Sequence, residues 1–310
     1  MFDKAISKIV LALAVVVSAS DGLAKVYKTY TIDKKPLTSI ANATEKFDKL
    51  LTNNKNLSKS DMTELIALAE EVLKQDEKWI DGYWIIGNMT FQLGSLLNDP
   101  KNHAEARRIF VKGRAATRKC LTIENKNPLC KLMLGAVIGK ISEIDGIFAS
   151  LKNADRVRTL WKDVSKSDYN YRFTDEVTMQ GSVHYALGLY YRLIPDSFLV
   201  DWLFDVQGNI NTSISYHRQS LKIDGPNACA TLMLAVSLLC KNGGETRGAI
   251  GKEALALLTS AEKMKRDDLN MAVCASDAKK IVKDPSLSCG YTAAKQQSFD
   301  ESELSKPTQN

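Results

Sequence analysis

The sequence predicts an all-α protein in which about four irregular helical hairpins stack into a compact solenoid. Apolar residues recur at helical spacing from Thr38 to about Lys283, and no convincing run of alternating apolar and polar residues appears. Only 7 Pro and 17 Gly occur in 310 residues, which argues against an all-β protein rich in turns. Apolar residues make up 45% of the chain and charged residues 25%, as is typical of globular proteins. We expect one helical-repeat domain over residues 38–290.

The first 24 residues have the three parts of a secretory signal peptide. Two lysines precede the unbroken apolar run 9–17, and Gly22 and Ala24 fit the −3 and −1 positions of a cleavage site. The alternative is a buried N-terminal helix. The run is too short to cross a bilayer, which needs about 20 apolar residues. We therefore predict an exported protein, periplasmic or alternatively extracellular, with no transmembrane segment after signal removal. Residues 25–37 are expected to be an extended N-terminal segment.

The helical pattern is clearest in two stretches after this segment. Ser58 and Asp61 offer N-caps for a helix, and residues 103–121 repeat its periodicity. The apolar face of the first helix is formed by Leu65, Leu68, Val72 and Leu73. The last residues, 291–310, are polar, and we predict a disordered tail there.

Four segments align on a small residue in the middle of a predicted helix. The small residues are Gly87, Gly135, Gly188 and Ala235, spaced 48, 53 and 47 residues apart. In three of the four segments a leucine lies 14 residues before the small residue. A small residue at mid-helix lets the second helix of a hairpin pack closely, so we predict helical-hairpin repeats. The alternative is coincidence, since any all-helical protein shows a few such matches.

The motif resembles a degenerate tetratricopeptide repeat: a turn, a helix with Leu-Gly, a helix with small residues, and a polar turn. Residues 221–228, Leu-Lys-Ile-Asp-Gly-Pro-Asn-Ala, look like the junction between two repeats of that family. Typical repeats have about 34 residues, so these are expanded by about 14. With the signal peptide, residues 61–261 resemble the T component of periplasmic tetratricopeptide-associated TRAP transporters. The chain departs from the best-known members because it lacks their lipidated cysteine.

This resemblance implies an exported scaffold without enzymatic activity that binds a protein partner. The implied partner is the periplasmic solute-binding component of a TRAP-type uptake system, and the implied assembly is a homo-oligomer such as a trimer. The alternative is a secreted interaction or adhesion module unrelated to transport. The net charge of +6 comes without a dense Lys/Arg block, so we expect no nucleic-acid partner.

The cysteine pattern agrees with export, because an even number of cysteines in an exported chain indicates disulfides. Cys120 and Cys130 flank a short polar stretch between two predicted helices, which brings them together. Cys229 and Cys240 lie about 16 Å apart along one continuous helix, too far to pair. Cys274 then pairs with Cys240, Cys229 or Cys289, and the spacing leaves these three open.

The sequence offers few candidates for catalytic or metal-binding residues. The three histidines, at 103, 184 and 217, lack metal-ligand spacing, and no nucleophile motif occurs. His217 is expected on a polar helix face beside Arg218. His184 precedes Tyr190 and Tyr191 on the same predicted helix, where it either faces a pocket or is simply packed. A hydrolase using His184 with an acidic partner is the least favoured class. We predict no catalytic residue, no cofactor and no metal.

Two apolar features exceed what a plain repeat needs. One is Trp84 at the start of the first Leu-Gly helix, and the other is segment 198–206, inserted within the third hairpin. In that segment we expect one helical face to dock on the body, leaving Val200 and Phe204 to be covered. The docking residues are expected to be Phe198, Leu199, Trp202, Leu203 and Val206. The segment either plugs the core or contacts a partner. The candidate partner or ligand surface comprises Trp84, His184, Tyr190, Tyr191, Phe198, Trp202 and Phe204.

Overall fold

The computed structural model describes residues 25–52, 57–97, 99–264 and 269–292, and they are mostly helical, which confirms the all-α prediction. The predicted signal peptide and nearly all of the predicted tail lie outside the described residues. The helices are α1 (Ala43–Thr52), α2 (Lys59–Gln75), α3 (Ile80–Ser95), α4 (His103–Ile123), α5 (Pro128–Asp145), α6 (Ile147–Lys166), α7 (Met179–Leu193), α8 (Phe198–Phe204), α9 (Ile210–Asp224), α10 (Ala228–Lys241), α11 (Gly248–Lys263) and α12 (Leu269–Lys283). Short 3₁₀ helices are η1 (Lys35–Ser39), η3 (Pro100–Asn102) and η4 (Pro285–Ser288).

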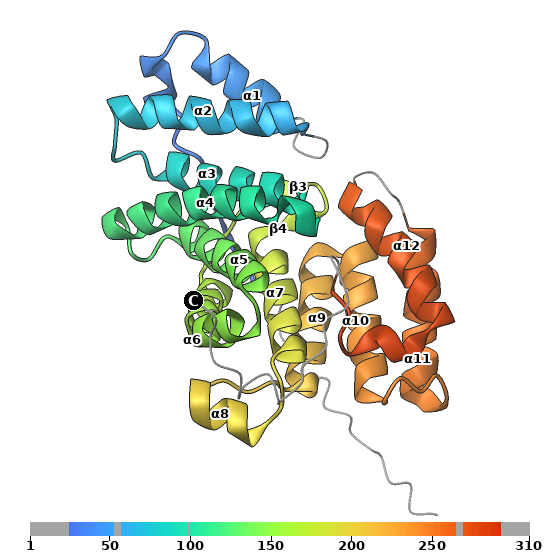
Figure 1. Ribbon diagram of the computed structural model, residues 1–310. Helices are drawn as coiled ribbons and strands as arrows, with labels where there is room; N and C mark the ends of the chain where they lie inside the picture. The colour runs from blue at the N-terminus through green and yellow to red at the C-terminus, as the bar shows by residue number, and fades with distance from the viewer. Residues whose placement is uncertain (1–24, 53–56, 98, 265–268, 293–310) are drawn as a thin grey trace, which may run out of the picture.

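Helices that follow one another along the chain pack side by side. This holds from α2 to α7, then for α7 with α9, and again from α9 to α12. Figure 1 shows α1 and α2 at one end, α3 to α7 below them, and α9 to α12 beside α7. The short helix α8 lies outside this series, at the end of the molecule far from α1 and α2.

Three of the four small residues at the helix centres lie directly against the next long helix of the series. A Cβ added at Gly87 would come within 2.5 Å of Thr117 on α4. At Gly135 and Gly188 the corresponding distances are 2.4 Å to Trp161 on α6 and 2.5 Å to His217 on α9. No side chain fits in these gaps, so the glycines allow the close approach of helices that the sequence predicted.

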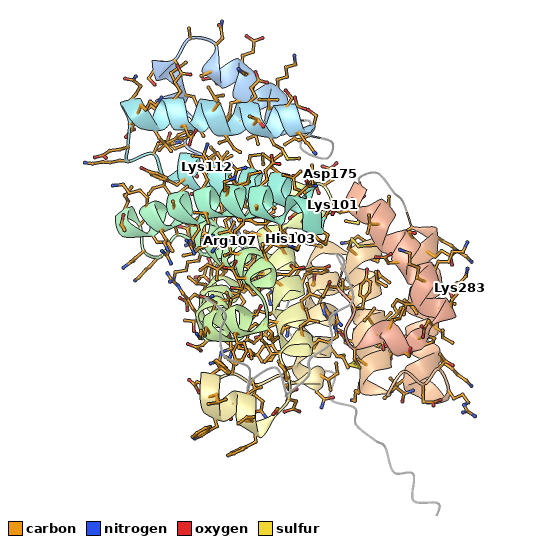
Figure 2. The ribbon with its side chains drawn as sticks, viewed as in Figure 1. Lys101, His103, Arg107, Lys112, Asp175 and Lys283 are labelled. Carbon is orange, nitrogen blue, oxygen red and sulfur yellow. A yellow bond between two sulfur atoms is a disulfide. The ribbon has the colours of Figure 1, made fainter. Side chains whose placement is uncertain are left out.

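Ion pairs join neighbouring helices at the surface. Arg107 of α4 donates two hydrogen bonds to Asp145 of α5, at 2.7 and 3.0 Å, and Lys112 of α4 pairs with Glu70 of α2 at 2.9 Å. Figure 2 shows Arg107 and Lys112 along α4. Exposed pairs of this kind contribute little, about 0–1 kcal/mol each.

The N-terminal segment 25–37 is fastened to the body and is only partly extended. It holds strand β1 (Lys28–Thr29) and the start of η1, whose Leu37 is fully buried. The carboxylate of Asp81 on α3 accepts hydrogen bonds from the Tyr30 hydroxyl at 2.8 Å and from Trp84 Nε1 at 2.6 Å. Its hydrogen bonds with Tyr30 and with the main-chain N–H of Asp33 anchor the segment from inside the protein, where burial raises the pKa of the Asp81 carboxyl.

Short strands also occur where the sequence shows no alternating pattern. β1 pairs in parallel with β2 (Tyr169–Asn170), and β3 (Arg172–Thr174) pairs antiparallel with β4 (Val177–Thr178). Runs of two or three residues are too short to leave a period-two signature, which explains why the sequence did not predict them.

Three disulfides link elements of the described chain. Cys120–Cys130 joins the end of α4 to the start of α5, as expected. Cys274 pairs with Cys229, one of its three possible partners, and so ties α12 to α10. Cys240 pairs with Cys289, so neither of these two cysteines is the partner of Cys274. The last two bridges close loops of 45 and 49 residues around the C-terminal helices.

The last described residues belong to the core. The disordered tail that the sequence predicts therefore does not begin at residue 291. Tyr291 is 7% exposed, and its hydroxyl donates to Asp277 at 2.8 Å. Arg192 of α7 is buried and donates to the carbonyl oxygens of Ser288, Cys289 and Tyr291. This guanidinium therefore holds the C-terminal segment against α7. Within the described ranges, no helix has both the length and the apolar character needed to span a membrane.

Candidate functional site

Helix α8 lies on an excursion of the chain that leaves the end of α7 and returns to the start of α9. Its two ends are tied together, because Gly208 N donates to Pro195 O at 3.1 Å and Asn209 N donates to Tyr191 O at 2.8 Å. A Cβ added at Gly208 would lie 1.9 Å from Ile194 O, so only glycine fits where the chain returns. The excursion is a closed surface loop with a short helix at its tip, a common architecture for binding segments.

Packing of α8 is the reverse of the expected arrangement. Val200 and Val206 are fully buried, and Phe204 is partly buried with them against Leu151 and Tyr190. The face expected to dock points outward instead, apart from Val206. Its exposed fractions are 83% for Phe198, 37% for Leu199, 71% for Trp202 and 47% for Leu203.

The outward face of α8 is an apolar patch, which we call the α8 patch (Phe198, Leu199, Trp202 and Leu203). Residues at positions i, i+1, i+4 and i+5 share one side of a helix, so the four side chains form one continuous surface. Fully burying each such side chain is worth about 1.5–3 kcal/mol. The folded chain forgoes most of this gain, and a partner would recover it.

Exposed charged residues lie on α8, in the loop around it and on α6. Asp196, Asp201 and Asp205 are exposed and close to the α8 patch in the sequence. Lys152 and Arg156 are exposed on α6, the helix on which α8 rests. An apolar centre bordered by charged residues is typical of protein-binding surfaces.

An aromatic cluster on α7 and α9 includes three of the sequence-predicted residues, and its Tyr190 packs with the buried Val200 of α8. The ring of Tyr191 stacks on Tyr216 at 5.7 Å, and His184 and Tyr190 lie 5.8 Å from Tyr216 and 5.2 Å from Tyr191. Lys162 Nζ lies 5.8 Å from the Tyr191 ring centre. His184 and Tyr190 are each 7% exposed, so this cluster supports α7 and α9 from inside.

His184 has the surroundings of a packed histidine. Its Nδ1 lies 2.7 Å from the carbonyl oxygen of Gln180, and the side chain of Gln219 makes a second hydrogen bond with the ring. Burial lowers the pKa of the imidazole, which favours its neutral form. Both of these hydrogen-bond partners are amide groups, and neither is the carboxylate that a hydrolase base uses for orientation.

Two further residues differ from the sequence interpretation. Trp84 is 1% exposed and belongs to the core around Asp81, so it cannot contact a partner. His217, which we expected on a polar face beside Arg218, is fully buried against Gly188. Burial lowers the pKa of His217 to about 3, so this imidazole is neutral at physiological pH. The expectation of a polar face came from Arg218, the charged residue that follows His217 in the sequence.

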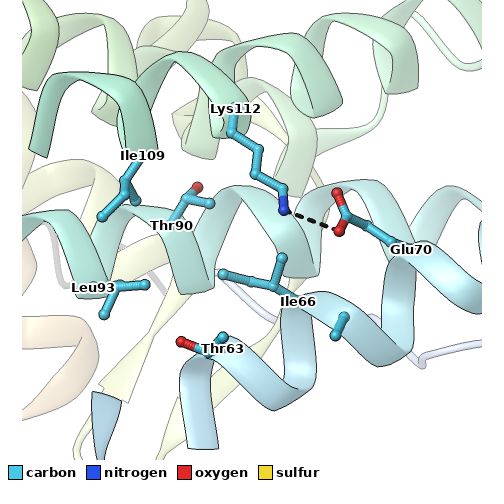
Figure 3. A pocket seen from close by; sticks show the side chains of 8 residues that line it. Thr63, Ile66, Glu70, Thr90, Leu93, Ile109 and Lys112 are labelled. Carbon is cyan, nitrogen blue, oxygen red and sulfur yellow. Dashed lines mark hydrogen bonds and ion pairs between the residues drawn. The ribbon is translucent and has the colours of Figure 1, made fainter. Parts of the chain in front are cut away.

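A cleft lies between α2, α3 and α4. Figure 3 shows Ile66, Leu93 and Ile109 in its lining, with the Glu70–Lys112 ion pair at one side. Its volume of about 190 Å³ is below the range of about 300–1,000 Å³ that small-molecule pockets occupy. Among the described residues, no group of three or more His, Cys, Asp or Glu side chains is placed to hold a metal ion.

Comparison with known proteins assigns no class to this chain. No protein-family model matches it, and no curated protein matches it either. The tetratricopeptide resemblance therefore rests on the residues and on helix packing alone.

Proposed function

We propose that this protein is an exported, non-enzymatic helical scaffold that binds protein partners through the α8 patch. The observation that carries the proposal is the exposure of Phe198 and Trp202, at 83% and 71%, on a loop whose ends are fixed. Large aromatic side chains are the usual anchors of protein interfaces. A folded protein gains nothing from presenting them to water, so their position favours a partner.

The scaffold in this proposal is a set of irregular tetratricopeptide-like hairpins. The pairs would be α3–α4, α5–α6, α7–α9 and α10–α11. Support comes from Gly87, Gly135 and Gly188, each of which allows the second helix of its own pair to pack closely. Helix α8 is then an insertion within the third hairpin, and an insertion of this kind maps to a surface where repeat proteins bind.

Export is proposed on the basis of the predicted signal and the three disulfides. Disulfides persist in oxidising compartments such as the periplasm or the extracellular space. The periplasm is the compartment that the family resemblance favours.

A second copy of the chain is the first partner we propose. The α8 patch is an exposed apolar helix face. Such a face is complementary to the same face of a second copy related by a two-fold axis. The family resemblance adds a second partner, a periplasmic solute-binding protein, and a trimer as the assembly.

The second partner can be tested by titration. If permease and solute-binding protein genes adjoin this gene, the purified solute-binding protein is titrated into the chain by calorimetry. We expect heat of binding with the wild type and with a Val273→Ser, Val282→Ser control, whose sites on α12 are 37% and 38% exposed. Phe198→Ser, Trp202→Ser should lose at least tenfold in affinity. Equal affinity for all three proteins would refute the role of α8.

A further inference from the structure

Among the residues that the structure describes, strand β1 is paired on one side only. Lys28 N donates to Asp168 O and Tyr30 N donates to Asn170 O, both at 2.7 Å. Main-chain groups along a strand alternate in direction, so those of Thr29 and Thr31 point away from β2. Within the described chain, the main-chain groups of Thr29 and Thr31 make no hydrogen bond. Both residues are exposed.

A groove runs along this open edge. Its volume is about 580 Å³, and it is lined by Thr29, Tyr30, Thr31, Ile32, Lys34, Asp48, Leu51 and Tyr171. The strand forms one wall and α1, through Asp48 and Leu51, forms another. An ion pair between Lys34 and Asp48 bridges the two. The groove therefore combines an unpaired main-chain edge with apolar contacts from Ile32, Leu51 and Tyr171.

The open edge is held in place before anything binds to it. The Tyr30 hydroxyl donates to Asp81 and accepts from Asn127 Nδ2 at 3.1 Å. Trp79 Nε1 donates to Asp33 O at 2.7 Å, just beyond the edge. A partner would thus lose little conformational freedom of the receptor on binding, which favours affinity.

We propose that this groove binds an extended segment of another polypeptide, which adds to the Thr29–Thr31 edge as a strand. Hydrogen-bond complementarity selects this occupant, because donors and acceptors at strand spacing match the main chain of a second strand. The alternating side chains of the segment would face the groove lining and the solvent in turn. This site is separate from the α8 patch, and the inference goes beyond the proposed scaffold function.

The experiment uses a displayed library of random octapeptides, with the protein purified from an exporting host and its disulfides intact. Thr31→Pro removes the outward N–H, which has no partner in the described chain, so the fold should be unaffected. Thr31→Val is the matched control, because it keeps the N–H and the β-branched shape. We expect selected peptides to bind the wild type and Thr31→Val within twofold of each other. Binding to Thr31→Pro should be at least tenfold weaker.

Amide hydrogen exchange supplies a readout that does not depend on a variant. A bound peptide should slow exchange at Thr29 and Thr31 and leave exchange at Lys28 and Tyr30 unchanged. Thr29→Pro provides a second test on the same edge if Thr31→Pro loses its circular dichroism spectrum. The proposal is overturned if no peptide is enriched over a Thr31→Pro bait, or if binding leaves the two amides unprotected. It is also overturned if Phe198→Ser, Trp202→Ser abolishes peptide binding.

Discussion

Helices α8 and α10 are both strongly apolar, yet they differ in what the fold does with them. In α8 six of seven residues are apolar, and Val200 alone is buried. In α10 eleven of fourteen residues are apolar and eleven are buried. Helix α10 is enclosed by α7, α9, α11, α12 and η4, whereas α8 rests on α6. The number of neighbours that the chain topology supplies therefore decides burial, and composition does not.

This comparison distinguishes apolar residues that stabilise the fold by burial from apolar residues that stay exposed and are available for binding. The side chains of α10 fill the space between four helices, so the packing of this part of the core depends on them. The α8 patch contributes little to folding, since its two aromatic side chains, Phe198 and Trp202, are mostly exposed. Substitutions on the two helices should therefore have opposite consequences, and the following experiments test this contrast.

The largest effect is expected from a charge placed in α10. Leu239 is fully buried, so Leu239→Asp leaves a carboxylate without a partner in the core and should lower the free energy of unfolding by at least about 4 kcal/mol. Leu203 is the matched site in α8, at 47% exposed, and Leu203→Asp should change it by less than about 0.5 kcal/mol. Urea unfolding measures both. Similar losses at the two sites would refute the contrast.

The next effect concerns the disulfide that anchors the end of α10. Cys240→Ser, Cys289→Ser opens a loop of 49 residues, and the chain-entropy model predicts a loss of about 4 kcal/mol or less. The matched variant Cys120→Ser, Cys130→Ser opens a loop of 10 residues and should cost about 1.4 kcal/mol less. Thermal unfolding under non-reducing conditions compares them. A larger loss from the short loop would contradict the entropic account.

Acid sensitivity should arise in the interior and not at α8. The pKa of His217 is about 3 in the folded protein against 6.5 for the unfolded chain. Below pH 6.5 the unfolded chain therefore binds a proton that the folded protein does not, and stability falls as the pH drops. The loss is about 1.4 kcal/mol per pH unit, or about 2 kcal/mol at pH 5.

The contribution of His217 can be isolated by substitution. His184, whose pKa is also lowered by burial, acts in the same direction, so the informative quantity is the difference between wild type and His217→Leu. Urea unfolding between pH 5 and 7.5 should show a shallower pH dependence in the variant. Identical slopes would mean that His217 is protonated in the folded state.

The smallest effect on stability is expected from the α8 patch itself. Phe198→Ser, Trp202→Ser removes side chains that are 83% and 71% exposed, so the free energy of unfolding should change by less than about 0.5 kcal/mol. Urea unfolding of a protein dilute enough to be monomeric measures this. A loss of more than 2 kcal/mol would show that the patch belongs to the core.

Much of this architecture could be predicted from the sequence, because helical spacing and small residues leave a local signal. The glycines at 87, 135 and 188 were found by their spacing, and so was the excursion that carries α8. Cys120–Cys130 followed from proximity along the chain. Each of these features depends on neighbours within one hairpin, where the pattern of residues and the geometry are directly related.

The rest depends on contacts that no local pattern specifies. Both faces of α8 are apolar, so the sequence contains no polar face to orient it, and the expected face was wrong. Burial of His217 depends on its position against Gly188 of another helix. Pairing of Cys240 with Cys289 depends on how η4 folds back onto α10.

Light scattering coupled to size exclusion tests most directly the claim that the α8 patch is a protein-binding surface. Three proteins are compared with their disulfides intact: the wild type, Phe198→Ser, Trp202→Ser, and the control Val273→Ser, Val282→Ser. The account predicts an oligomer for the wild type and the control, and a folded monomer for the α8 variant. Equal masses for the wild type and the α8 variant would contradict the claim, because a second copy of the chain would then not bind at α8.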